Sequence, residues 1–138
     1  MSVFATGLLT SEENLPVHGR LIAIPRDIEP SQGAYELTQG ERGLAVVFVV
    51  YHQGEPLDLT GYDVQLLTDG PGGVQPLYDA PDAVPSADAS RGEVRWAVPP
   101  EVTAQAGTFS AQVVVSSGSE TWRVSNVMRF RVRPVVED

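Results

Sequence analysis

The sequence predicts an all-β domain built as a sandwich of two sheets. Short apolar runs alternate with clusters of Gly, Pro, Asp and Ser, and valine, a strand former, occurs 20 times. Helical periodicity is confined to one short segment. Strands spaced in this way favour a two-layer sandwich, with a barrel as the alternative architecture.

Seven to eight strands are expected, because each apolar run is long enough for one strand and ends in turn residues. The runs lie at residues 19–24, 34–38, 44–51, 62–68, 74–78, 93–98, 109–116 and 121–133. Residues 69–73 predict a hairpin turn, and residues 78–92 predict a long surface loop. Residues 100–107 predict one short helical turn, because Pro100 suits the first helical position and Gly107 suits a left-handed stop.

The last run carries the clearest alternation of apolar and polar residues. Its even positions are mainly apolar, whereas arginines occupy odd positions. We expect one core to contain Trp96, Val113, Trp122, Val124, Phe130 and Val132. Asn126 interrupts the apolar row, and the run is too long for one flat strand in a small sandwich. A bend or bulge at residues 125–127 is therefore expected.

Composition excludes several classes of function. A net charge of −9 argues against binding to nucleic acid or to anionic membranes, since both depend on summed positive potential. Cysteine is absent, which excludes thiol catalysis and Cys-ligated metals. No apolar run approaches the length of a membrane span, and no signal peptide is recognisable.

Motifs for catalysis or metal binding are missing. The two histidines, His18 and His52, lie in no recognised catalytic or phosphate-binding motif. Asp79, Asp82 and Asp88 offer oxygen atoms that suit calcium, but their spacing matches no calcium-binding loop. We therefore expect a non-enzymatic protein without a cofactor. A hydrolase is the third hypothesis, after a structural role and a carbohydrate-binding or adhesion role.

Two features predict surfaces that bind partner proteins. Arg129, Arg131 and Arg133 alternate along the last run, so they share one strand face and can meet acidic surface, of which residues 1–90 carry most. An ordinary solvated strand face is the alternative. Residues 44–50 are apolar on both faces, so the face with Val47 and Val49 must be covered by this chain or by another subunit.

Residues 1–18 do not join the strand pattern and predict an N-terminal arm that precedes a sandwich domain at residues 19–138. Such segments are usually disordered unless something holds them. We expect the arm to bind a neighbouring subunit, as part of a homo-oligomer for which a trimer is one option.

Several stretches together suggest a family. They are Gln39-Gly40-Glu41, the segment from Gly54 to Gly61, the segment from Gly92 to Glu101, and the segment from Ala106 to Phe109. Over residues 34–133 the chain resembles the N-terminal domain of phage baseplate upper proteins. The resemblance implies an immunoglobulin-like antiparallel β-sandwich, a domain that recurs in phage tail and head-fibre components.

What the resemblance implies for function is a structural role in the virion. The partners would be other phage structural proteins, reached through the arm and an apolar sheet face, and the protein would be made in the host cytoplasm. Baseplate upper proteins continue into a helical stem, whereas this chain stops at Asp138. It therefore looks like an adaptor, a decoration or a fibre-attachment subunit on a capsid, tail or baseplate. The alternative is a carbohydrate-binding or adhesion module on the same sandwich.

Overall fold

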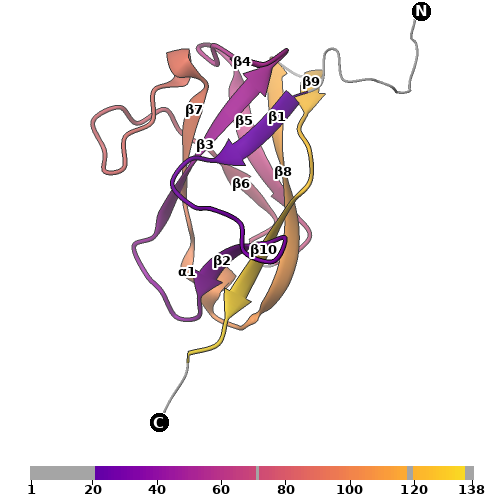
Figure 1. The fold of residues 1–138 in the computed structure, drawn as a ribbon. Helices are drawn as coiled ribbons and strands as arrows, with labels where there is room; N and C mark the ends of the chain where they lie inside the picture. Colours follow the sequence, from indigo (N-terminus) through magenta and orange to yellow (C-terminus); the bar gives the residue numbers. More distant parts are fainter. Residues whose placement is uncertain (1–20, 71, 118–119, 136–138) are drawn as a thin grey trace, which may run out of the picture.

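Two β-sheets face each other in the computed structural model, which describes residues 21–70, 72–117 and 120–135 (Figure 1). The smaller sheet contains β1 (Leu21–Pro25), β3 (Ala45–His52), β4 (Glu55–Pro56) and β7 (Glu93–Ala97). The larger sheet contains β2 (Tyr35–Thr38), β5 (Asp63–Thr68), β6 (Val74–Pro76), β8 (Gly107–Ser117), β9 (Glu120–Val124) and β10 (Met128–Arg133). The predicted all-β sandwich is confirmed, whereas the predicted arm lies outside the described residues.

One strand organises each sheet. In the smaller sheet β3 lies between β1 and β7, and in the larger sheet the order is β2-β10-β8-β5-β6. The long strand β8 has β5 along one edge, while β9 and β10 share its other edge one after the other. The pairs are antiparallel, except that β2 runs parallel to β10. The chain passes from β1 in the smaller sheet to β2 at the edge of the larger sheet, beside the final strand.

The predicted bend at residues 125–127 is confirmed, and it divides the last run into β9 and β10. Val124 lies opposite Val114, but Met128 lies opposite Ala111, so β9 and β10 contain one residue more than the matching part of β8. An extra residue reverses which face each later side chain occupies. The prediction that Val124 joins the core is therefore wrong, and its side chain is 42% exposed. The side chain of Trp122 lies outside the described residues.

The core forms between the sheets from the alternate side chains that point inward. The other four predicted core residues are confirmed, since Trp96, Val113, Phe130 and Val132 are all buried. The largest fully buried side chains are those of Trp96, Phe48, Phe130, Leu21, Leu59 and Leu66. The rings of Trp96 and Phe130 meet edge to face with their centroids 5.8 Å apart, so the two sheets are joined by aromatic packing.

The connections follow the predictions in outline. The predicted helical turn is α1 (Pro100–Thr103), which starts at proline as expected. It ends at Thr103, with Ala104 as its C-cap, rather than at Gly107, which is the first residue of β8. The predicted surface loop 78–92 is more ordered than expected. It contains a bridge between Ala80 and Ala87 and the 3-10 helix η1 (Ala89–Arg91).

Gly92 ends η1 in the left-handed conformation, at φ 79°. A Cβ atom placed there would lie 2.7 Å from the carbonyl oxygen of Val50. Glycine is favoured here, because a Cβ atom would force the backbone at Val50 to shift.

A polar clasp of Ser125 and Asn126 joins the two sheets along one side of the sandwich. The Ser125 hydroxyl accepts a hydrogen bond from the backbone N–H of Val113 at 2.9 Å. The side-chain oxygen of Asn126 accepts one from the backbone N–H of Ala23 in β1 at 2.7 Å. The residue that interrupts the apolar row of the sequence therefore satisfies a donor on the free edge of β1, across the gap between the sheets.

Candidate docking surface

The arginine row, defined as Arg129, Arg131 and Arg133, lies on the outer face of the larger sheet. The alternation of β10 puts Met128, Phe130 and Val132 in the core and the arginines on the opposite side. Arg129 and Arg133 are exposed, and Arg131 is half-buried. The structure therefore brings together the three charges that the sequence predicts to share a face, whereas their role in binding a partner stays a prediction.

Glu36 of the neighbouring strand β2 lies against two of these arginines. The parallel register sets Glu36 beside Arg131, whose Nη1 lies 3.1 Å from Glu36 Oε2. The Nη1 of Arg133 lies 3.5 Å from Glu36 Oε1. No ion pair joins Arg129 to another residue in the part of the chain that the structure describes. The single carboxylate of Glu36 thus pairs with two of the three guanidinium groups, and the row keeps an excess of positive charge.

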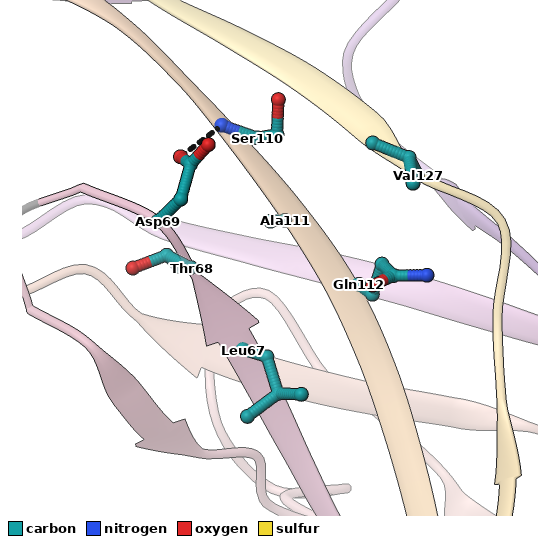
Figure 2. Close-up of a pocket in the computed structure, with 7 residues that line it drawn as sticks. All are labelled: Leu67, Thr68, Asp69, Ser110, Ala111, Gln112 and Val127. Carbon is teal, nitrogen blue, oxygen red and sulfur yellow. Dashed lines mark hydrogen bonds between the residues drawn. The ribbon is translucent and has the colours of Figure 1, made fainter.

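A hollow of about 250 Å³ lies beside the arginine row on the same outer face. Figure 2 shows Leu67 of β5 and Val127, which precedes β10, on either side of β8. The floor is the β8 segment from Ser110 to Gln112, and Thr68 and Asp69 close one end. Asp69 accepts a hydrogen bond from the backbone N–H of Ser110 at 2.7 Å, which fixes that end. Ser110 is also the register partner of Arg129, so the hollow and the arginines are contiguous.

The hollow belongs to a wider group of exposed apolar side chains, which we call the outer patch. The outer patch consists of Leu67, Val74, Val124 and Val127, with exposed fractions of 38%, 55%, 42% and 62%. Val74 lies directly opposite Leu67, and Val124 lies opposite Val114, a nearly buried residue of the same face. The face therefore combines exposed apolar side chains and a hollow of mixed lining, which includes the carboxylate of Asp69, with the arginine row beside it. Exposed apolar side chains gathered on one face commonly mark a contact with another protein.

Val47 and Val49, the other predicted partner-binding residues, lie on the outer face of the smaller sheet. Their exposed fractions are 0% and 9%. Arg26 and Glu93 lie on opposite sides of β3, and their side chains meet at 3.3 Å above these two valines. The cover that the sequence predicts therefore comes at least partly from this chain. That the two valines bind a partner stays a prediction, and it requires the Arg26–Glu93 pair to move aside.

The acidic loop uses its carboxylates to hold its own backbone. Asp79 accepts a hydrogen bond from the backbone N–H of Ala89 at 3.2 Å. Asp88 accepts from the Ser90 hydroxyl at 2.7 Å and from the Ser90 N–H at 3.0 Å, which lowers the pKa of Asp88 below its ordinary value. Among the described residues, no group of three His, Cys, Asp or Glu side chains is placed to hold a metal ion.

His52 lies at the end of β3 and is half-buried, while His18 lies outside the described residues. No helix within the described ranges is long and apolar enough to cross a membrane. Sequence reasoning missed Glu36 and the outer patch. The only signal for Glu36 was a lone acid in a short strand, whose pairing depends on a parallel register that alternation does not predict.

Comparison with known proteins agrees with the resemblance and extends it. The family model described as the BppU N-terminal domain, BppU being the baseplate upper protein, matches residues 11–137. The match begins well before residue 34, where the sequence stretches suggested that the resemblance starts, and it includes β1. A search of curated proteins found no match.

Proposed function

Because this chain belongs to the baseplate upper protein N-terminal domain family, a family of phage baseplate structural proteins, we propose that it is a non-enzymatic adaptor subunit of the virion. The family implies contacts with other phage structural proteins and a location in the virion. The finer proposal is that the chain attaches to its assembly through its N-terminal arm and through the arginine row and outer patch.

The observation that carries the proposal is the composition of the outer face of the larger sheet. A hollow with Leu67 and Val127 on its two sides, together with exposed valines, lies directly beside arginines that carry more charge than Glu36 offsets. Protein interfaces often combine an apolar centre with a charged border, where opposite charges on the partner give orientation and specificity. The hollow of about 250 Å³ is smaller than the roughly 300–1,000 Å³ of small-molecule sites.

The alternative of a carbohydrate-binding module gains no support from the aromatic residues. Sugar sites use exposed aromatic rings beside polar groups. Trp96 is fully buried, and among the described residues Tyr78 is the one exposed aromatic side chain, at 53%. A lone tyrosine on the loop that follows β6 does not form a platform with the outer patch.

The proposal is tested by removing the arm from the protein in infected cells. We expect a chain without residues 1–16 to fold, because the described core begins at Leu21, and to be missing from purified phage particles. The matched control carries an arm of the same length and composition in scrambled order, and it should also fail to join the particle. Normal incorporation of both variants would overturn the role of the arm.

A further inference from the structure

We propose that the outer patch and the arginine row of one copy bind residues 3–13 of the arm of a second copy. This inference rests on the proposed function and deepens it, because it names the occupant of the docking surface. The occupant is a segment of this same chain, and the contact links two copies head to tail rather than joining equivalent faces.

The apolar part of the arm matches the apolar part of the surface. Val3, Phe4, Leu8 and Leu9 give the arm two groups of apolar side chains within seven residues. The hollow between Leu67 and Val127 is large enough for one such side chain as an anchor, and the exposed valines of the outer patch lie beside it. A large apolar side chain that fills a hollow is the usual centre of a protein contact.

The charged part of the arm matches the arginine row. Glu12 and Glu13 follow Leu9 after a two-residue spacer, Thr10 and Ser11. The arginine row begins at Arg129, directly beside the hollow, and Arg129 has no ion pair with another described residue. An arm that anchors Leu8 or Leu9 in the hollow therefore carries its two carboxylates to the side of the surface where positive charge is in excess.

The order of these features along the chain favours a second copy over the same copy. Leu21, where the arm joins β1, forms a bridge with Ser125, two residues from Val127 and the hollow. Along β10 the arginines run away from that junction. Followed back from Leu21, however, the arm presents Glu13 and Glu12 first and its apolar residues later. The same arm would have to reverse direction to match its own surface, whereas an arm from another copy can approach with the matching order.

Disulfide trapping in the purified full-length protein tests the contact, since the chain contains no cysteine of its own. A Leu8→Cys variant is mixed with an isotope-labelled Val127→Cys variant under mild oxidation, and the mixed covalent dimer is identified by mass. The matched control replaces Val127→Cys by Ile24→Cys, since Ile24 is an apolar residue 42% exposed on the outer face of the smaller sheet. We expect the mixed dimer with Val127→Cys and little with Ile24→Cys.

Any one of several results would overturn the inference. Equal trapping at both positions would show random collision rather than docking. In a protein carrying both Leu8→Cys and Val127→Cys, an intramolecular disulfide without covalent dimer would show that the arm folds onto its own surface. A second measurement does not depend on cysteine: Leu8→Asp with Leu9→Asp should raise the dissociation constant of self-association roughly tenfold or more, as expected for the loss of buried apolar side chains. Unchanged self-association would also contradict the inference.

This test separates the inference from the proposed function, because it uses no other phage component. Trapping in the purified protein together with normal particle assembly of the armless chain would contradict the proposed function alone. Absence of trapping together with loss of the armless chain from particles would contradict the inference alone. The arm would then bind a protein other than a second copy of this chain.

Discussion

Phe109 and Phe130 lie directly opposite each other on β8 and β10, and their rings stack with centroids 5.3 Å apart and an interplanar angle of 9°. The Phe130 ring also contacts Tyr35 of β2, at 5.6 Å between centroids, and Phe48 of the opposite sheet, at 6.3 Å. One side chain of the last strand thus connects the edge, the middle and the facing layer of the sandwich.

Replacement of Phe130 by alanine should lower the free energy of unfolding by about 3–5 kcal/mol, because it leaves a cavity among these rings. Urea denaturation measures the change. The matched control is Val127→Ala, three residues earlier and 62% exposed, which should change stability by less than about 0.5 kcal/mol. An unchanged midpoint for Phe130→Ala would show that the register of β10 is wrong.

Replacement of Gly92 by alanine should destabilise the protein by roughly 2 kcal/mol or more, because positive φ and a collision with the Val50 carbonyl add together. Gly54 is the matched control, since it has φ 83° and nothing within 4 Å of its Cβ position. Gly54→Ala should cost only the conformational part, about 1–2 kcal/mol. Equal losses in thermal denaturation would mean that the Val50 carbonyl moves aside at little cost.

Stability should decline in acid partly through Asp88. Hydrogen bonds from the Ser90 hydroxyl and backbone lower the pKa of Asp88 in the folded protein below 3.8, the ordinary value expected in the unfolded chain. The contribution is therefore present above that value and is lost as the pH falls through the lower pKa of the folded state. Ser90→Ala should make stability less dependent on pH in this range. Ser86→Ala, at an exposed serine of the same loop, should leave the dependence unchanged in urea titrations.

Neutralisation of the arginine row should weaken association without unfolding the domain. Exposed ion pairs contribute only about 0–1 kcal/mol each, so replacing all three arginines by glutamine should preserve the melting temperature. Sedimentation at a series of salt concentrations should show that the triple variant associates more weakly than the wild type. The difference should be largest at low ionic strength, where charges are least screened. Arg129→Gln alone should weaken association by much of the same amount. Arg42→Gln, which changes an exposed arginine outside the row, should leave association unchanged. Superimposable profiles for the wild type and the triple variant would reduce the row to solvated surface.

Strand positions and the core could be predicted where alternation is uninterrupted. Trp96, Phe130 and Val132 lie on strands without irregularity, and they are buried as expected. The prediction failed for Val124 because one extra residue near Asn126 reverses the faces. A sequence indicates that a strand must bend, but the residue count across the bend depends on its partner strand.

The candidate site was predictable only in part for a similar reason. The arginine row follows from the spacing within one strand, and the structure places it on one face as expected. Glu36 and the outer patch depend on which strands become neighbours, since Leu67, Val74 and Val127 come from three separate segments. Local alternation predicts the face on which a side chain lies, but it does not predict which residues of other strands become its neighbours in the sheet.

The clasp between Asn126 and Ala23 also bears on how the chain folds during synthesis. Its two residues are separated by 103 positions. The partner strand of β2 is β10, which also lies almost a hundred residues later in the chain. Neither β1 nor β2 can acquire these neighbours while β10 is still inside the ribosome. Chains dominated by such distant pairings fold slowly and expose unpaired edges meanwhile. Completion of the sandwich therefore has to wait until β10 has left the ribosome, and the surface that β10 forms becomes available for assembly only after that step.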